Sequence, residues 1–108
     1  MINKVLKALK EKDYVGLAQC FSKDCKYSDY CPSLNGKQNY FVHGREGVEM
    51  FFRNRFVFDH FEIGSPRAES ETEGTFFGYY DAPYVYARLR IEGFDEDGLI
   101  TKLVISAA

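Results

Sequence analysis

Hydrophobic residues recur at three- and four-residue spacing near the start of the chain. In the first such stretch they are Ile2, Val5, Leu6 and Leu9, with lysines between them. In the second stretch they are Tyr14, Leu17, Ala18 and Phe21. This spacing predicts two amphipathic helices. We expect the first to end near Lys12 and the second to be capped at its start by Asp13.

A third helical stripe lies further along, at Val48, Phe51, Phe52 and Phe56. Either His43 or Gly44 would begin this helix, and Glu46 in its first turn suits the positive end of the helix dipole. Between the second and third helices, residues 25–29 alternate in polarity. They predict a strand that places Cys25, Tyr27 and Asp29 on its less polar face.

From residue 57 onward the pattern changes from helical to alternating, with Val57, Phe61 and Ile63 in one phase. Further strands are expected over residues 75–81, 84–94 and 99–106, with a hairpin at Glu73-Gly74, a break at Ala82-Pro83 and a turn over residues 95–98. Helices followed by antiparallel strands predict a single α+β domain over residues 1–108. In this domain a curved, mainly antiparallel sheet wraps around three helices.

Composition limits the partners that this domain could have. Hydrophobic residues make up 45% of the chain and aromatic residues 17%, with ten Phe and eight Tyr, which indicates either a lined cavity or an adhesive surface. The formal net charge of −2 gives no field that would attract nucleic acid or an anionic membrane. No stretch resembles a signal peptide or a membrane span, so we expect a cytoplasmic protein.

The metal-binding residue types are few and scattered. Cys20, Cys25 and Cys31 have neither zinc-knuckle nor redox-motif spacing, and we expect them to be reduced and packed. The two histidines, His43 and His60, are interpreted as a helix-start residue and a surface residue. We therefore expect no metal site and no cofactor.

Asp29 is the candidate for chemistry because it lies on the inward face of its strand. A carboxylate there is costly unless it is paired, hydrogen-bonded or protonated. One interpretation places Asp29 in a pocket, where burial would raise its pKa; the other makes it a cap for the turn at Tyr30-Cys31-Pro32. The long loop of residues 30–43 is either a lid that covers such a pocket or a disordered segment, and we favour the lid.

Four stretches together resemble the ketosteroid isomerase and SnoaL-like group of the nuclear transport factor two-like superfamily. They are residues 13–25, Asp29 at the end of the first strand, residues 43–46 at the start of the third helix, and residues 94–100. The resemblance runs over most of the chain and implies a cystatin-like, cone-shaped fold. Because that scaffold serves isomerases, cyclases, hydratases and plain binding proteins, it does not fix the activity.

The resemblance carries only part of the isomerase site to this chain. Asp29 matches the general base, which would move a proton on a carbon next to a carbonyl. The phenols of the oxyanion hole and its support fall on Val5, Phe21 and Phe52, and the second acid falls on Arg90. Losing one oxyanion donor typically costs about a hundred- to a thousandfold in rate, so we do not expect ketosteroid isomerase activity.

The resemblance also implies an aromatic cavity beside Asp29. The candidate ligand-binding residues are Tyr14, Phe21, Tyr27, Phe52, Phe56 and Leu103. We expect a SnoaL-like protein that binds a small apolar molecule, with Asp29 as the candidate acid or base of an isomerase-, cyclase- or hydratase-like proton transfer. The alternative is a non-catalytic protein-interaction or dimerisation module that uses the outer face of the sheet.

The strand over residues 84–94 alternates aromatic and basic side chains on its polar face. These are Tyr84, Tyr86, Arg88 and Arg90. Such interleaving can stack single-stranded nucleic acid. However, the acidic alternation at Glu69, Glu71 and Glu73 supplies cross-strand partners, and the resemblance implies a dimer through this face. We therefore expect a homodimer and no nucleic-acid partner.

Overall fold

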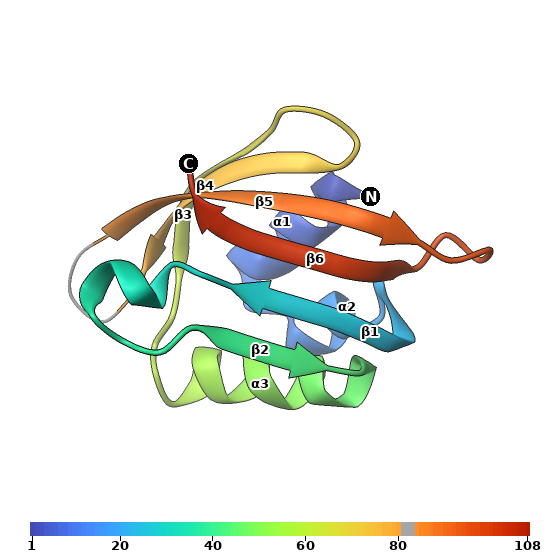
Figure 1. Ribbon diagram of the computed structural model, residues 1–108, viewed down its shortest axis with the longest axis horizontal. Helices are drawn as coiled ribbons and strands as arrows, with labels where there is room; N and C mark the ends of the chain where they lie inside the picture. The colour runs from blue at the N-terminus through green and yellow to red at the C-terminus, as the bar shows by residue number, and fades with distance from the viewer. Residues whose placement is uncertain (81–83) are drawn as a thin grey trace.

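The strand order brings the first and last strands of the chain side by side in the interior of one sheet. The computed structural model describes residues 1–80 and 84–108. The strands are β1 (Phe21–Asp29), β2 (Tyr40–His43), β3 (Ile63–Ala68), β4 (Glu73–Tyr79), β5 (Tyr84–Phe94) and β6 (Ile100–Ala107), in the spatial order β2-β1-β6-β5-β4-β3. The arrows of β1 and β6 point the same way in Figure 1, and these two strands pair in parallel. The other neighbouring pairs are antiparallel, which confirms an α+β fold with a mainly antiparallel sheet.

The helices cover one face of this sheet. They are α1 (Ile2–Glu11), α2 (Tyr14–Ala18) and α3 (Arg45–Val57), with a short 3-10 helix, η1 (Pro32–Asn35). In Figure 1, α1 and α2 lie behind the strands and α3 runs along the edge near β2. Helix α1 packs on β3 and β4, whereas α3 packs on β1 and β2, and α2 contacts both of the longer helices. The core therefore lies between the sheet and the three helices.

The two helix boundaries predicted near residue 12 are confirmed. Helix α1 buries the stripe of Ile2, Val5, Leu6, Ala8 and Leu9. It stops at Lys12, whose left-handed φ of 59° turns the chain. Oδ1 of Asp13 then accepts a hydrogen bond of 2.9 Å from the backbone N–H of Gly16, so Asp13 caps α2 as expected.

Helix α2 is shorter than its hydrophobic spacing predicted. It ends at Ala18, and Phe21 begins β1 instead of completing the helical stripe. Phe21 pairs with Ile100 of β6, and an irregularity in register follows before Lys26. The residue is buried, as the pattern required, but from a strand. Tertiary pairing has overridden a local helical spacing here.

The segment expected to be a structureless loop, residues 30–43, contains both η1 and β2. Strand β2 is an edge strand that pairs antiparallel with β1, from Asp29 opposite Tyr40 to Lys26 opposite His43. With only four residues, β2 is too short for alternation to reveal it. The loop expectation was therefore wrong for these residues.

The strand expectations after α3 are partly wrong in their boundaries. Val57 is the last residue of α3 and not the first of a strand. The hairpin turn lies at residues 69–72, before Glu73, where Ser70 Oγ accepts hydrogen bonds from the backbone N–H groups of Thr72 and Glu73. The turn is therefore stabilised by Ser70, through hydrogen bonds to its own backbone, and the predicted Glu73-Gly74 pair lies in β4 instead.

The last hairpin agrees with the sequence. Strand β5 covers the predicted range. Oδ1 of Asp95 accepts hydrogen bonds from the backbone N–H groups of Asp97 and Leu99, and these hold the predicted turn over residues 95–98. The break expected at Ala82-Pro83 lies outside the described residues.

The helices of the described ranges are short. None of them is long and apolar enough to cross a membrane.

Candidate functional site

Asp29 is the last residue of β1 and points toward the interior. Its position is set by pairing on both sides, with Tyr40 of β2 and Ile105 of β6. Only 1% of its surface is exposed. Cys25 and Tyr27 are buried with it, whereas Lys26 is exposed, so the inward phase predicted for this strand is confirmed.

Three donors surround the Asp29 carboxyl group. The backbone N–H of Cys31 donates to Oδ1 at 2.9 Å. The hydroxyl groups of Tyr80 and Tyr27 donate to Oδ2 at 2.5 Å and 3.4 Å. Asp29 therefore caps the following turn with one oxygen, as one interpretation of the sequence expected, and its other oxygen faces two buried phenols. Its place in a ligand pocket stays a prediction.

Burial changes the proton affinity of every member of this group. It raises the pKa of Asp29, while the hydrogen bonds from Tyr80 and Cys31 and the charge of Arg55 oppose the rise. Burial and the nearby Asp29 charge raise the pKa of both Tyr27 and Tyr80 well above the usual range. They also raise the pKa of the Cys31 thiol to about 12. At neutral pH the phenols and the thiol keep their protons, which leaves Asp29 as the group of this set that can exchange one.

Arg55 is a buried cation that the sequence reasoning did not single out. It lies on the buried stripe of α3 between Phe52 and Phe56. Its Nη1 donates to the Tyr40 hydroxyl at 3.2 Å and lies 3.9 Å from the Asp59 carboxylate. The centre of its guanidinium group is 4.3 Å from the Phe61 ring centroid, 4.8 Å from that of Tyr40 and 5.4 Å from that of Tyr80. Aromatic faces stabilise this largely buried cation.

A continuous set of rings connects these polar groups. We call it the aromatic cluster: Tyr27, Tyr40, Phe51, Phe52, Phe56, Phe61 and Tyr80. Successive centroids lie 5.2 Å apart for Tyr27 and Phe52, 5.5 Å for Phe52 and Phe56, and 6.2 Å for Phe56 and Phe61. Phe61 in turn packs edge-on against Tyr80 at 5.2 Å. The cluster joins α3 to β1, to β2 and to the segment that follows β4.

The residues predicted to bind a ligand are distributed between this cluster and the core. Tyr27, Phe52 and Phe56 belong to the aromatic cluster, whereas Phe21 and Leu103 are core residues with at most 1% exposure, and Tyr14 is partly buried against the core. Ligand contact by any of them stays a prediction.

Sequence reasoning placed Cys31 in the turn that Asp29 would cap, but it missed three other neighbours of Asp29: Tyr40, Arg55 and Tyr80. Arg55 left a signal, because it occupies a buried phase of α3. Tyr80 left none, because only the strand order brings it to a residue 51 positions earlier.

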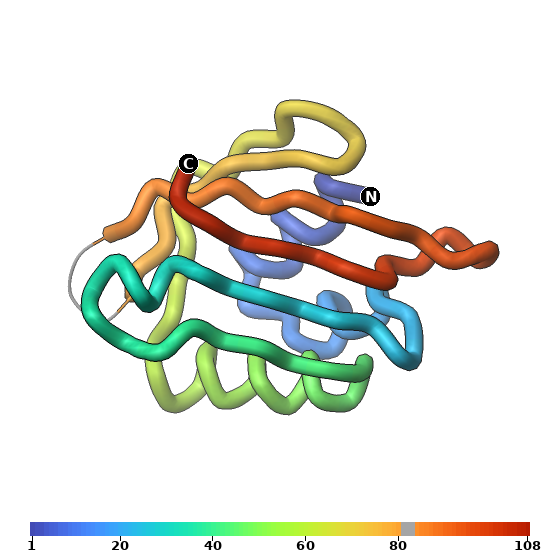
Figure 2. Tube along the Cα trace, viewed as in Figure 1, coloured from blue at the N-terminus to red at the C-terminus, as the bar shows by residue number. Residues whose placement is uncertain are grey.

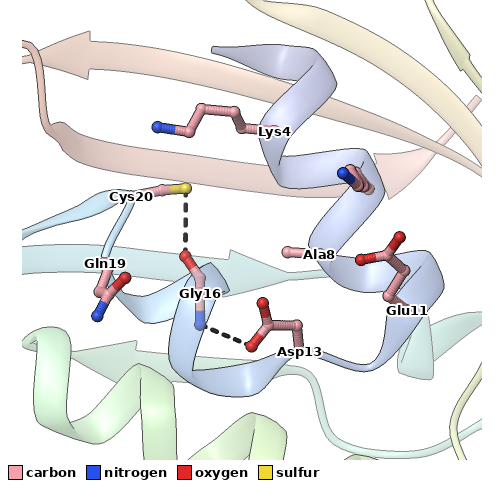
Figure 3. Close-up of a pocket in the computed structure, with 8 residues that line it drawn as sticks. Lys4, Ala8, Glu11, Asp13, Gly16, Gln19 and Cys20 are labelled. Atoms are coloured by element: carbon pink, nitrogen blue, oxygen red, sulfur yellow. Dashed lines mark hydrogen bonds between the residues drawn. The ribbon is translucent and has the colours of Figure 1, made fainter.

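Among the hollows that open on the surface of the described residues, three of the best defined do not include Asp29 in their lining. Figure 3 shows the one between α1 and α2, of about 280 Å³, where the Cys20 thiol donates to the Gly16 carbonyl oxygen at 3.5 Å. Lys4 and Glu11 border the same hollow, and no aromatic ring lines it. The other two, of about 460 Å³ and 240 Å³, lie at the start of α3 and beside the β1–β2 pair. The hollow beside the β1–β2 pair is lined by Tyr27, a member of the aromatic cluster, together with Phe41.

The cysteines are packed as expected, whereas His43 ends β2 and Gly44 is the N-cap residue at which α3 begins. Cys20, Cys25 and Cys31 are free and buried. His43 and His60 are exposed. Over residues 1–80 and 84–108, no three His, Cys, Asp or Glu side chains gather where they could hold a metal ion.

Comparison with known proteins identifies the fold. No protein-family model and no curated protein matches the sequence. A SnoaL-like protein of unknown function from Burkholderia thailandensis is 18% identical, with a TM-score of 0.63 over 99% of this chain and 90% of that one. A Silicibacter pomeroyi protein with a cystatin-like fold is 15% identical, with a TM-score of 0.67 over 99% and 72%.

A Mycobacterium tuberculosis protein, solved in complex with estradiol-17β-hemisuccinate, is 15% identical, with a TM-score of 0.62 over 98% of this chain and 89% of that one. Identities of this size show a shared fold and leave the activity open. The chain has the cystatin-like fold of the SnoaL-like proteins, as its sequence resemblance predicted.

Proposed function

We propose that this chain binds a small, mostly apolar ring compound against the aromatic cluster and that Asp29 exchanges a proton with it. The observation that carries this proposal is the position of Asp29, a buried carboxyl group among phenols and phenyl rings. Binding sites for small molecules are mainly apolar, with a few polar groups that orient the ligand. Asp29, Tyr80 and Arg55 are polar groups of that kind.

The proton-transfer chemistry of Asp29 follows from its surroundings. In its ionised form the carboxylate can remove a proton from a carbon next to a carbonyl, which leaves an enolate, and can return that proton to another carbon of the same molecule. A raised pKa makes the carboxylate a better base than an exposed aspartate. Tyr80 keeps its proton and holds the carboxyl group in place through the 2.5 Å hydrogen bond.

The size and chemistry of the ligand are suggested by the fold. The M. tuberculosis protein, which shares this fold, holds a steroid ester. In this chain the flat faces of Phe52, Phe56 and Phe61 would contact the rings of a fused-ring compound. A compound with two to four fused rings is therefore the ligand class that we propose.

Access to Asp29 would require movement at η1. The side-chain amide of Asn35, the last residue of η1, donates to the backbone carbonyl of Tyr80 at 3.3 Å, and Figure 2 shows this segment beside the end of β4. Cys31, at the start of η1, holds Asp29 through its backbone N–H. We propose that η1 is the lid expected from the sequence, because its opening would uncover both Asp29 and Tyr80 without disturbing the sheet.

Calorimetric titration with estradiol-17β-hemisuccinate and with 2-naphthoate tests this function. We expect saturable binding of at least one probe, and a proton exchange seen as a binding enthalpy that depends on the ionisation enthalpy of the buffer. Asp29→Asn should abolish that proton exchange, because the amide cannot titrate. Asp24→Asn, which changes an exposed carboxylate of the same strand, is the matched control and should leave it unchanged. Failure of both probes to bind would contradict the proposed function.

A second candidate function rests on the opposite face of the sheet. Phe77 and Tyr86 are exposed and stack with ring centroids 4.7 Å apart, and Tyr79 and Tyr84 lie beside them at 5.4 Å from each other. We call these four residues the outer aromatic patch. We propose that it forms a homodimer interface, since exposed aromatic area of this kind marks interaction sites. This role and ligand binding at Asp29 are compatible, because they use opposite faces of the sheet.

A further inference from the structure

The guanidinium group of Arg55 has hydrogen-bonding capacity that the described residues do not use. Arginine carries N–H donors on three nitrogens. Among the described residues, Arg55 uses only Nη1, which donates to the Tyr40 hydroxyl at 3.2 Å. The Asp59 carboxylate lies 3.9 Å from the same Nη1, too far for a hydrogen bond. Neither Nε nor Nη2 has a hydrogen-bond partner among residues 1–80 and 84–108.

The unused donors are reachable from outside. Throughout the described residues, no buried side-chain nitrogen or oxygen lacks a hydrogen-bond partner. Nε and Nη2 of Arg55 must therefore keep some contact with solvent, although only 8% of the side chain is exposed. The fork that these two nitrogens form is the part of Arg55 that a ligand could approach.

The buried acid nearby does not occupy this fork. Asp29 has its own three donors, from Cys31, Tyr80 and Tyr27. The Asp59 side chain is 52% exposed, and a partly solvated pair at 3.9 Å neutralises little of the charge. Arg55 is also the single buried cation of the described residues. Within residues 1–80 and 84–108, its charge is stabilised by ring faces and no carboxylate makes a hydrogen bond to it.

We propose that Arg55 determines ligand specificity by holding the carboxylate of an apolar ring acid, with one carboxylate oxygen on Nε and the other on Nη2. This inference rests on the proposed function and narrows its ligand class from apolar ring compounds to their monocarboxylic acids. The ring system would pack against Phe61 and Phe56, and the carboxylate would lie at the edge of the aromatic cluster.

The geometry favours a carboxylate over other polar groups. Nε and Nη2 match the two oxygens of a carboxylate in parallel hydrogen bonds, whereas a ketone offers one oxygen and no charge. A phosphate carries more charge than a single arginine balances, and no second buried cation lies in the described residues. The single guanidinium group of Arg55 is therefore best matched by a single carboxylate group on the ligand.

Two compounds of nearly the same shape test this assignment. 2-Naphthoate carries the carboxylate, and 2-naphthamide replaces it with a neutral amide. We expect the unmodified protein to bind the acid about ten- to a hundredfold more tightly than the amide, as judged by calorimetry, because charge-assisted hydrogen bonds are stronger than neutral ones.

Variants at Arg55 separate recognition from structure. In Arg55→Gln the acid should lose that preference over the amide, and in Arg55→Lys it should keep only part of it, because the ammonium group retains the charge without the fork. Arg53→Gln, an exposed arginine of the same helix, is the matched control and should keep the full ratio. Circular dichroism reports whether each variant is folded. If Arg55→Gln is not folded, the acid-to-amide affinity ratios of the unmodified protein and of Arg55→Lys still test the role of Arg55.

The outcomes distinguish this inference from the function on which it rests. Equal binding of acid and amide by the unmodified protein would overturn the role of Arg55 and leave ligand binding at the aromatic cluster intact. An undiminished preference for the acid in Arg55→Gln would also overturn it. If neither compound nor the steroid ester binds, the proposed function itself is wrong.

Discussion

The Tyr80 hydroxyl donates a 2.5 Å hydrogen bond to Oδ2 of Asp29 across 51 positions of the sequence. Tyr80 follows β4, and Asp29 ends β1, which pairs with the last strand of the chain. The contact thus exists only when the whole sheet is assembled. It is also the shortest of the three hydrogen bonds that Asp29 receives.

Removing this hydroxyl should destabilise the fold and raise the pKa of Asp29 further. Hydrogen bonds to charged groups contribute about 1.5–3 kcal/mol, so we expect Tyr80→Phe to lower the free energy of unfolding by about that amount. Tyr27→Phe, which removes a donor at 3.4 Å, is the matched control and should have a smaller effect on both quantities. Urea unfolding and carboxyl carbon NMR measure them. A larger effect of Tyr27→Phe would show that Tyr27, and not Tyr80, donates the stronger hydrogen bond to Asp29, which would contradict the distances in the structure.

Stability should depend on the ionisation of Asp29. Burial raises the pKa of Asp29 in the folded protein, so protonation of this group favours the folded state. This contribution is fully present below the pKa of the unfolded chain, about 4, and is lost as the pH rises through the higher pKa of the folded protein. The amide in Asp29→Asn does not titrate. The unfolding free energy of the unmodified protein, relative to that variant, should therefore fall across this window.

The matched control for this titration is Asp24→Asn, because Asp24 is exposed on the same strand. Its difference from the unmodified protein should stay nearly constant over the same pH range. A constant difference for Asp29→Asn as well would show that Asp29 ionises in the folded protein as it does in the unfolded chain, and the proposed proton exchange would lose its basis.

Local patterns predicted the parts of the fold that local forces determine. The buried stripe of α1 and the cap at Asp13 are decided by side chains within one or two turns, and the inward phase of Asp29 follows from the alternation of β1. The extended range of β5 and the turn at Asp95 are likewise encoded in their own residues. Resemblance added the order of these parts and hence the cystatin-like fold.

Pairing over long distances explains what the patterns did not predict. Phe21 fits a helix by spacing, yet β6 draws it into β1. Strand β2 has four residues and exists because β1 offers it an edge. The candidate site shows the same limit, since Asp29 and Tyr27 lie on one strand and were predicted together, whereas Tyr80 and Arg55 reach them through the topology. A charged residue on a buried helical stripe, as at Arg55, is the signal that would have revealed one of these two.

The cysteines should be inert in the folded protein. Burial raises the pKa of Cys20 and of Cys25, and it raises that of Cys31 to about 12, so only about one Cys31 in ten thousand would be a thiolate at pH 8. We expect iodoacetamide to modify all three rapidly in urea and very slowly under native conditions, as followed by mass spectrometry. Fast native labelling of Cys31 would mean that η1 opens often, since Cys31 lies directly before that helix.

The outer aromatic patch should mediate self-association. Phe77 is 43% exposed and Tyr86 47%, which leaves a stacked pair facing solvent on the outer side of β4 and β5. The arginine beside this pair, Arg88, is already matched within the chain by Glu69 and Glu73. The aromatic surface itself therefore remains as the part that a second copy would cover.

We expect a homodimer at tens of micromolar in sedimentation velocity, the range in which an interface of about 800 Å² per partner is ordinarily populated. Tyr86→Lys should shift the protein to monomer, because it removes one ring of the stacked pair and places two like charges at a symmetric contact. Phe58→Ser is the matched control: Phe58 is a similarly exposed aromatic residue at the end of α3, away from the outer face, and its loss should leave the dimer intact. A monomeric unmodified protein at these concentrations would refute the interface. Dissociation by both variants would place the contact elsewhere, because a patch confined to β4 and β5 cannot depend on Phe58.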